Sequence, residues 1–391
     1  MRKPSTNDPY VGREQTAAKH FILRRYLQTL AFKLLQGPHS ALTYVDGFSG
    51  PWESKTKDFA DTSFMIAIAV LKDANQRLRQ NTIHREIRCF FVEENARAYR
   101  QLRDVVMAHH DPENGFHVAT FQGRFEDAMT DIMTFIGNSF ALTFIDPTGW
   151  TGYGFDKIAP ILRHHPGEVL VNYMFDHISR FAGWGNPKNS ASFNAILGGQ
   201  DWKQRLDNSL PMSDAMEKLF CEQFRAAGTF KYVLSTRIAK LADRPHFSIA
   251  YGTRSPAGLR AFREIEYSAL RDHDVRRSQA KMAISHQKTG QPDMFAAADL
   301  MLPNSMDTIV AAQRLLAKPW LAAYLREHSR AAKFSEIWEV VLPAFVLRVT
   351  DVKDICVELA KEGLIKAPWR EEVPRKHKPS DHHVIELHRG V

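Results

Sequence analysis

The sequence is poor in cysteine and has no long apolar segment. Its 391 residues include 3 cysteines, Cys89, Cys221 and Cys356, which lie too far apart to form a local cluster motif. We therefore expect a reduced, cytoplasmic protein. Residues 1–15 lack the apolar core of a signal peptide, and no apolar run approaches the length of a membrane span. The sequence predicts no contact with a membrane.

Acidic residues are fewer than basic ones. The sequence has 52 Lys and Arg residues and 44 Asp and Glu residues, which gives a formal net charge of +8. Basic side chains neutralise phosphates and release their counterions, so this balance favours contact with a polyanion, and nucleic acid is the expected partner. A modestly basic surface without such a partner fits the same count. A chain of this length with 44% hydrophobic residues is expected to form two globular domains.

Strand-like apolar runs alternate with helical patterns through the first two-thirds of the chain. Runs that are apolar on both faces suit parallel strands covered by helices on each side. The order therefore predicts an α/β fold with a doubly wound, Rossmann-like sheet. The expected parallel strands are 41–48, 87–94, 116–123, 140–147 and 167–175. Two further runs, 231–239 and 246–254, could pair as an antiparallel edge.

The pattern changes after residue 271. Residues 272–307 are rich in polar residues and contain Pro and Gly, which indicates a loop or linker. This segment would separate a Rossmann-like domain (1–271) from a smaller domain (308–391). Helical patterns at 308–327, 333–345 and 350–369 then predict a small helical domain, with Thr350 as a helix cap.

The sequence that follows these helices resembles a winged-helix domain, because Leu359, Gly363 and Ile365 match an L-x-x-x-G-x-I pattern before the wing. This resemblance implies basic residues that contact phosphates from a helix, the wing or the tail. Those residues are Lys353, Arg370, Arg375 and Lys376. A dimerisation or partner-docking module is the alternative.

A glycine turn follows the first expected strand, in the stretch TYVDGFSGPWES. Asp46 ends the strand, and Gly47, Phe48 and Gly50 form the turn. Glycine lets a backbone turn tightly and approach a ligand, although a simple chain reversal also needs glycine. In a doubly wound sheet, ligands lie at the carboxyl ends of the strands. Glu93, at the end of the second strand, is suited to accept hydrogen bonds from ribose hydroxyls.

This pairing resembles class I S-adenosylmethionine-dependent methyltransferases. The resemblance implies S-adenosylmethionine as cofactor, with its ribose on Glu93 and its cationic sulfonium favoured by Asp46. It also implies that Glu126 or Asp127 lies near the adenine. Both carboxylates equally fit the ordinary negative charge of a first helical turn.

The fourth expected strand ends in FIDPTGW. This resembles the motif of nucleic-acid amino-methyltransferases, in which Asp, Asn or Ser precedes two prolines and an aromatic residue. The resemblance implies that Asp146 and the backbone at Pro147 orient an exocyclic amine, while Trp150 stacks on the base. Thr148 replaces the second proline, and Gly149 shifts the aromatic residue by one position. A capped turn at Asp146 and an edge-covering Trp150 are the alternatives.

Several local stretches in order resemble the three-Cys-motif partner protein family, TcmP, over residues 15–270. They are KHFILRRYL, YVDGFSGPW, FIDPTGWTGYGFDKIAPIL, EVLVNYMFDHISRF and GTRSPAGLRAFREI. The resemblance implies a methyltransferase-like domain often encoded beside a phage-associated protein with three clustered cysteines. That neighbouring protein is a second expected partner.

Further polar residues are candidates for the substrate side of the site, each with a structural alternative. Asn172 and Tyr173 follow the fifth strand, Lys19 lies on the first helix, and Arg254 lies in a turn. The tail holds His377, His382, His383 and His388 without a cysteine partner or fixed scaffold, so no metal site is predicted. Two functions result: a methyltransferase acting on DNA or RNA, or a catalytically silent or nuclease-like module that binds nucleic acid and a partner.

Overall fold

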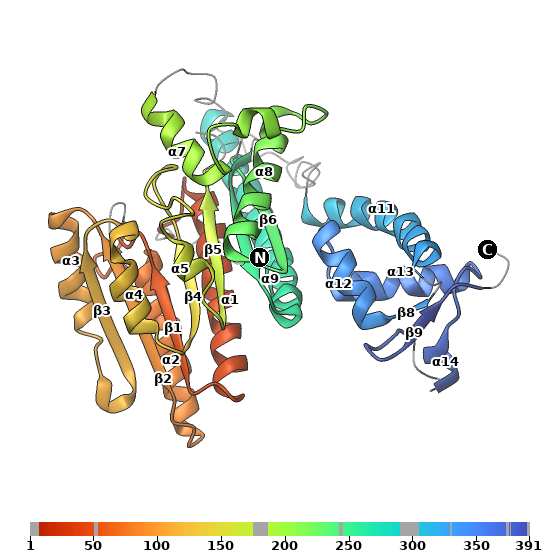
Figure 1. The fold of residues 1–391 in the computed structure, drawn as a ribbon, viewed down its shortest axis with the longest axis horizontal. Helices are drawn as coiled ribbons and strands as arrows, with labels where there is room; N and C mark the ends of the chain where they lie inside the picture. Colours follow the sequence, from red (N-terminus) through yellow and green to blue (C-terminus); the bar gives the residue numbers. More distant parts are fainter. Residues whose placement is uncertain are drawn as a thin grey trace. The chain divides into compact units, whose positions relative to one another are not determined.

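The computed structural model describes residues 8–50, 54–174, 187–241, 245–289, 305–328, 331–372, 375 and 377–388. The chain forms two compact units, Met1–Arg254 and Ser255–Val391 (Figure 1). Seven strands of the first unit form one sheet. They are β1 (Ala41–Asp46), β2 (Glu86–Glu93), β3 (Phe116–Gln122), β4 (Phe140–Ile145), β5 (Gly167–Tyr173), β6 (Tyr232–Ala239) and β7 (Pro245–Thr253).

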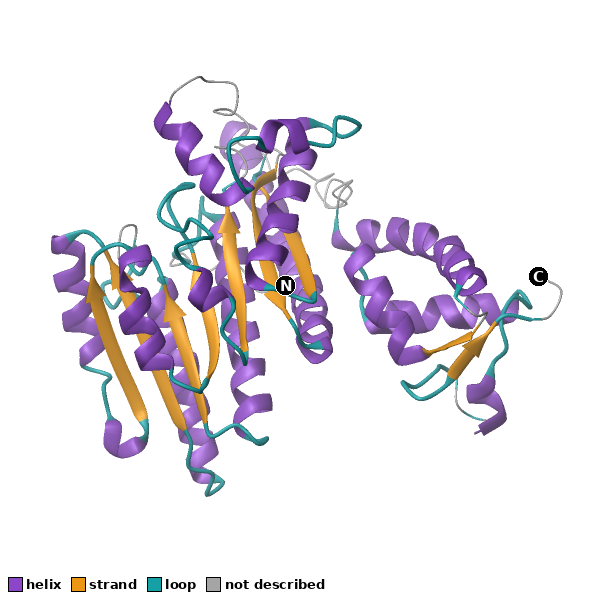
Figure 2. Cartoon of the chain, in the orientation of Figure 1, coloured by secondary structure: helices purple, strands orange, loops and turns teal. Residues whose placement is uncertain are grey.

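The strand order is β3-β2-β1-β4-β5-β7-β6 (Figure 2). The first five strands are mutually parallel, and β7 runs antiparallel to both β5 and β6. The chain passes outward from β1 to β3 on one side and from β4 to β5 on the other. The strand order therefore reverses between β1 and β4, where doubly wound folds bind ligands beyond the carboxyl ends of the strands.

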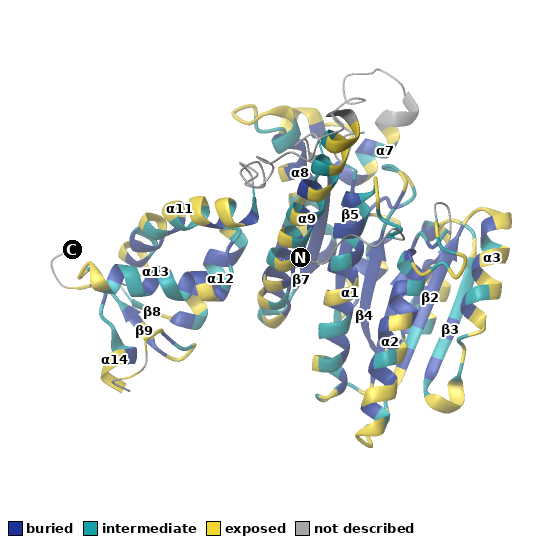
Figure 3. Ribbon diagram, turned by 180° about the vertical axis from the view of Figure 1, so that it is seen from behind, coloured by how far each residue is buried: buried dark blue, intermediate teal, exposed yellow. Residues whose placement is uncertain are grey.

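Helices cover both faces of this sheet. One face carries α1 (Glu14–Leu35), α2 (Ser63–Gln80) and α3 (Ala96–Met107), and the other carries α4 (Met129–Ile136), α5 (Ala159–Leu162) and α8 (Met212–Gly228) (Figures 1 and 3). The central strands β1, β4 and β5 are buried along nearly their whole length, which explains their continuous apolar sequences. The remaining elements are η1 (Pro112–Asn114), η2 (Phe125–Ala128), α7 (Pro187–Leu197) and η3 (Trp202–Arg205).

The mixed α/β class and the mostly parallel sheet agree with the sequence prediction. Each expected strand is present, and β6 and β7 pair antiparallel as expected. Strand β7 also pairs with β5 and so lies inside the sheet, while β6 forms the edge.

The expected linker is helical over its first half. Helix α9 runs from Pro256 to Thr289, and α11 begins at Met306. Residues 290–304 lie outside the described residues. The polar side chains of α9 form intrahelical ion pairs, such as Arg276 with Asp272 at 2.8 Å, and these pairs stabilise a helix in a sequence with little apolar pattern. The division between the units falls at Ser255, before this helix.

The second unit combines helices with one small sheet. Its elements are α9, α11 (Met306–Glu327), β8 (Ala331–Lys333), α12 (Phe334–Ala344), α13 (Val349–Lys361), α14 (Pro368–Glu372) and β9 (Val384–Glu386). Strands β8 and β9 pair antiparallel. Arg348, rather than Thr350, occupies the N-cap of α13, and its backbone N–H donates to Asp351 at 2.9 Å. The winged-helix interpretation of this unit stays a prediction.

Among the described residues, no helix is both long enough and apolar enough to cross a membrane.

Candidate functional site

The glycine turn is built on Asp46, whose side chain is completely buried at the end of β1. Its Oδ1 accepts the Phe48 N–H at 3.1 Å, and its Oδ2 accepts the Ser63 hydroxyl at 2.7 Å. Burial raises the pKa of this carboxyl to about 6, even though these hydrogen bonds act in the opposite direction. Asp46 therefore stabilises the conformation of the turn through Phe48 and links the turn to the start of α2 through Ser63.

Gly47 is required by the close approach of a neighbouring ring. A Cβ at this position would lie 2.8 Å from the ring of Phe125, which also packs against Phe48 at 5.8 Å between centroids. The Ser49 N–H then donates to the Val92 carbonyl at 2.8 Å, which ties the turn to the end of β2. The turn therefore packs between the ends of β1 and β2 and the first residue of η2, Phe125.

Glu93 ends β2 beside this turn and is 4% exposed. Its Oε1 accepts the Asn95 N–H at 2.6 Å, while Asn95 caps α3 with its own side chain. A carboxylate offers about four lone-pair positions to hydrogen-bond donors, and Glu93 also lines the cavity described below. The start of α3 orients the Glu93 carboxylate at the carboxyl edge of the sheet.

Asp146 lies at the end of β4 and makes two close contacts. Lys19 of α1 places its Nζ 2.5 Å from Asp146 Oδ2. Asn172 of β5 donates from its Nδ2 to Asp146 Oδ1 at 2.6 Å. Three residues that the sequence nominated separately therefore form one cluster, which joins the first helix to the ends of two neighbouring strands.

Asn172 has one polar atom without a hydrogen-bond partner in the described structure. The residue is 2% exposed, and its Oδ1 is buried with no donor in reach. The amide cannot simply be turned around, because Asp146 requires the donating nitrogen on its side. An unpaired buried acceptor costs about 1–3 kcal/mol, and a donor on a ligand would relieve that cost.

One cavity of about 570 Å³ lies at the carboxyl edge of the sheet, and Glu93, Asp146 and Asn172 line it. A volume of this size is typical of small-molecule and cofactor sites. The sequence-predicted residues that line the cavity are Lys19, Gly47, Phe48, Gly50, Glu93, Asp146, Pro147 and Asn172. The ends of β1, β2, β4 and β5 thus contribute to a single site at the strand-order reversal.

Sequence reasoning missed part of the wall that α1 and the chain before α2 contribute. Arg13 pairs with Asp61 at 2.6 Å, and both line the cavity. Burial acts to raise the pKa of Asp61, but hydrogen bonds from Lys55, Ser54 and Arg13 outweigh it and lower that pKa. No local motif marks this pair, because its members lie 48 positions apart in the sequence.

His20 is a second cavity residue that the motifs did not identify. It is 7% exposed, and its Nδ1 lies 3.0 Å from the Tyr10 hydroxyl. Burial, helped by the charge of neighbouring Lys19, holds the His20 pKa well below its usual range. The imidazole therefore lines the cavity in its neutral form at neutral pH. Its position next to Lys19 in the sequence was the available signal.

No protein-family model and no curated protein sequence matches this chain. Among solved structures, the chain is similar to protein LPL1258 from Legionella pneumophila str. Philadelphia 1, with 13% identity and a TM-score of 0.34 over 63% of this chain and 88% of that one. It is also similar to loganic acid methyltransferase with SAH, with 10% identity and a TM-score of 0.28 over 72% of this chain and 92% of that one. Both likenesses are distant.

Trp150 contributes to a second cavity and not to the first. Its ring stacks on Phe193 of α7 with 5.4 Å between centroids. The second cavity has a volume of about 380 Å³ and shares Arg124, Thr151 and Gly152 with the first. The aromatic residue of the FIDPTGW motif therefore lines a different cavity from Asp146.

Three further sequence candidates lie outside the main cavity. Glu126 accepts the Gly154 N–H at 2.8 Å and pairs with Lys157 at 2.9 Å, so it secures the loop after β4. Asp127 is exposed and lines neither cavity. Tyr173 is buried in the core, where it stacks on Phe220 at 4.1 Å. Their neighbours Arg124 and Phe125 line the main cavity instead.

Arg254 lies at the opposite end of the sheet, near the start of β5. Its Nη2 donates to the carbonyls of Leu162, at 2.9 Å, and of Gly228. Its guanidinium also lies over the Phe230 ring at 4.8 Å. The sequence-based assignment of Arg254 to the substrate is therefore replaced by a structural role.

The basic candidates of the second unit occupy varied environments. Lys353 is half-buried, with its Nζ 5.8 Å from the centre of the Phe334 ring. Arg370, on α14, and Arg375 are exposed. Lys376 lies outside the described residues. The structure leaves Arg370 and Arg375 available to an external phosphate.

Proposed function

We propose that the first unit is an S-adenosylmethionine-dependent methyltransferase that acts on an exocyclic amine of nucleic acid. One observation carries the proposal: the glycine turn, Glu93 and Asp146 line the same cavity at the strand-order reversal, although they are separated in the sequence. The sheet, with an antiparallel strand inserted beside β5, also resembles that of class I methyltransferases.

The residues present fit the cofactor. Glu93 supplies a buried carboxylate for ribose hydroxyls, and the turn at Gly47 and Gly50 exposes backbone to the cavity. Asp46, the sequence candidate for the cationic sulfonium, is buried and does not line the cavity, so its part is to support the turn. When bound, S-adenosylmethionine supplies a methyl group to a nucleophilic nitrogen.

The acceptor end of the site is the cluster at the ends of β4 and β5. Asn172 Oδ1 is a buried acceptor that needs a donor, and the Asp146 carboxylate retains accepting capacity beside it. Two acceptors side by side suit an amino group, because each can take one N–H and so direct the nitrogen lone pair away from them. Lys19 holds Asp146 in position through its ion pair.

The proposed substrate class rests on charge and on the motif. The net charge of +8 favours a polyanion, and FIDPTGW resembles the motif of enzymes that methylate bases. Membership of the TcmP family, with its phage-associated partner protein, forms part of the same proposal and rests on the ordered motifs of residues 15–270.

One observation favours the second candidate function, a catalytically silent module. Both Asp146 oxygens already have partners, since Lys19 contacts Oδ2 and Asn172 contacts Oδ1. If a substrate amine does not compete with these contacts, the unit would bind the cofactor without transferring its methyl group. Binding and transfer must therefore be measured separately.

Titration calorimetry with S-adenosylhomocysteine tests the cofactor site. Glu93→Gln keeps an oxygen for the Asn95 N–H but removes the charge, so we expect the Kd to rise at least ~10-fold, as for the loss of a charged hydrogen bond. Glu86→Gln is the matched control, because Glu86 lies on the same strand at its exposed opposite end. Equal affinities for the parent, Glu93→Gln and Glu86→Gln would contradict the assignment.

Transfer of labelled methyl groups into mixed DNA and RNA then tests the reaction. The proposed enzyme labels nucleic acid, and the label is found on a base amine. Cofactor binding without incorporation into any nucleic acid would favour the silent module.

A further inference from the structure

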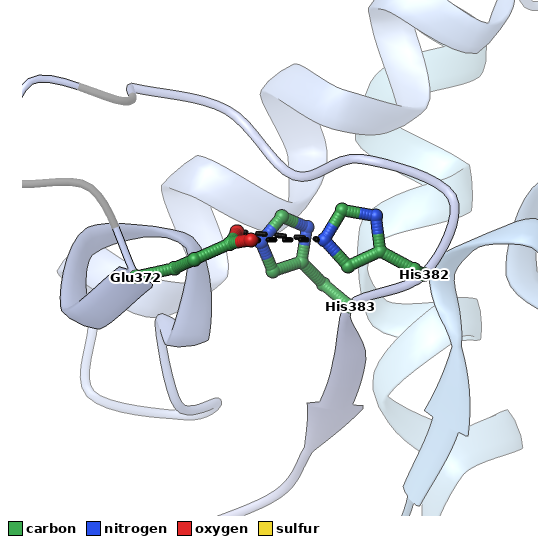
Figure 4. Close-up of side chains that lie close together, drawn as sticks. All are labelled: Glu372, His382 and His383. Carbon is green, nitrogen blue, oxygen red and sulfur yellow. Dashed lines mark hydrogen bonds and ion pairs between the residues drawn. The ribbon is translucent and has the colours of Figure 1, made fainter.

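The tail of the second unit gathers metal-ligating side chains that are separate from the methyltransferase cavity. Glu372 ends α14, and His382 and His383 precede β9. One ligand atom from each of the three side chains lies within 4.8 Å of the others. Figure 4 shows both imidazole rings directed at the carboxylate. We propose that Glu372, His382 and His383 bind a divalent transition metal, with Zn²⁺ as the expected ion.

The distances suit a tetrahedral ion with few adjustments. Ligands placed ~2.0–2.1 Å from Zn²⁺ in a tetrahedron are separated by ~3.3–3.4 Å. His382 Nε2 lies 3.3 Å from Glu372 Oε1 and 3.4 Å from Oε2. His383 Nε2 lies 2.6 Å from Oε2, so this pair must open by under ~1 Å to admit the ion. Water would complete the coordination.

The three side chains stand on a fixed scaffold, which the tail sequence alone did not reveal. Trp369, one turn before Glu372, is completely buried and anchors α14. The His383 carbonyl accepts the Phe334 N–H at 2.8 Å, which joins this residue to the paired strands β8 and β9. The backbone beside Glu372 and at His383 is therefore held in place by packing and by a hydrogen bond.

The Nδ1 atom of His383 contacts the backbone of Ser380. It accepts the Ser380 N–H at 2.7 Å and lies 3.1 Å from the Ser380 carbonyl oxygen. An ion on Nε2 displaces the proton from that atom, and a neutral imidazole then carries its proton on Nδ1, so the contact with the Ser380 N–H must open and the Ser380 carbonyl becomes the acceptor. Imidazole and carboxylate ligands of this kind suit Zn²⁺ better than Ca²⁺ or Mg²⁺, which prefer oxygen alone.

The test measures Zn²⁺ binding to the full chain, with any affinity tag removed, by competition with a chromophoric chelator. His382→Ala and Glu372→Gln alter exposed side chains and so should leave folding intact. We expect one Zn²⁺ per chain in the parent and a Kd at least ~10-fold higher in each variant, as for the loss of one coordinating group. His377→Ala, an exposed histidine of the same tail, is the matched control and should bind as the parent does.

Substitution with Co²⁺ gives an independent readout, because a tetrahedral site produces strong visible absorption. The bands should appear in the parent and in His377→Ala, and should be lost in His382→Ala. The proposal is overturned if the parent binds no Zn²⁺, or if His382→Ala and Glu372→Gln match its affinity and stoichiometry.

Discussion

Asp46 has a structural role, and its contribution to the free energy of unfolding depends on pH. The carboxyl is completely buried, and burial raises its pKa from the ordinary value of 3.8 to about 6. Between these two values the folded protein keeps the proton that the unfolded chain releases. The contribution of Asp46 to stability is therefore full below pH 4 and is lost as the pH rises through 6.

Asp46→Asn should remove this dependence, because the amide is neutral throughout and can still accept the Phe48 N–H. The free energy of unfolding of the variant, minus that of the parent, should increase by up to ~3 kcal/mol between pH 4 and pH 7. Urea unfolding at pH 4, 5, 6 and 7 measures this difference. A difference that is constant over the range would show that Asp46 titrates normally.

Asp146 separates cofactor binding from transfer in the proposed reaction. Asp146→Ala should keep affinity for S-adenosylhomocysteine and lose methyl transfer, since it removes a contact made to the acceptor. Asp146→Asn should keep part of the activity, because its amide oxygen can still accept a hydrogen bond. Single-turnover transfer and calorimetry on the same preparations measure the two effects. Unchanged incorporation by Asp146→Ala would remove this residue from the mechanism.

The glycine turn is an element whose shape depends on a ring from elsewhere in the chain. A Cβ on Gly47 would lie 2.8 Å from Phe125, so Gly47→Ala should destabilise the fold by ~1–3 kcal/mol and weaken cofactor binding. The cost should fall in a Phe125→Ala background, with a coupling energy above ~0.5 kcal/mol. Urea unfolding of the four proteins gives this coupling.

Gly149→Ala is the matched control for that cycle. Gly149 lines the same cavity, but a Cβ there meets no atom within 4 Å. It should leave stability within ~0.5 kcal/mol of the parent. Additive effects of Gly47→Ala and Phe125→Ala would mean that the ring does not enforce the glycine.

The central strands could be predicted from the sequence because β1, β4 and β5 are continuous apolar runs that are buried along nearly their whole length. The turn and Glu93 followed from the same logic, since they come directly after two such runs. The ion pair of Lys19 with Asp146 could not be predicted, because it joins residues 127 positions apart. The place of Trp150 in the second cavity could not be predicted, because its ring stacks on Phe193, which lies on a helix far along the chain.

The linker was misassigned for a different physical reason. Residues 272–289 are polar, their helix carries ion pairs such as Arg276 with Asp272, and the side chains that it buries include His273 and Arg277 rather than an apolar face. Hydrophobic periodicity, the main signal for a helix, does not detect such a segment.

The charge of the whole molecule predicts a measurable salt dependence. If Arg370 and Arg375 each contact a phosphate, replacing both with Gln should make the slope of log K against log salt shallower by about 2 for duplex DNA. Arg326→Gln is the control, because Arg326 is an exposed arginine elsewhere in the same unit. Fluorescence anisotropy at several salt concentrations measures the slopes. Equal slopes for all three proteins would place the contact elsewhere.

The position of β7 has a consequence for synthesis of the chain. Strand β6 is made first, yet its partner in the sheet is β7, which also fills the edge of β5. A nascent chain that has emerged from the ribosome only as far as residue 241 therefore carries β6 without its partner strand, while the edge of β5 is still unpaired. Exposed edges of this kind attract other strands. Residues 245–253 must emerge before the sheet can close, so a pause in translation before that point prolongs the exposure of both edges.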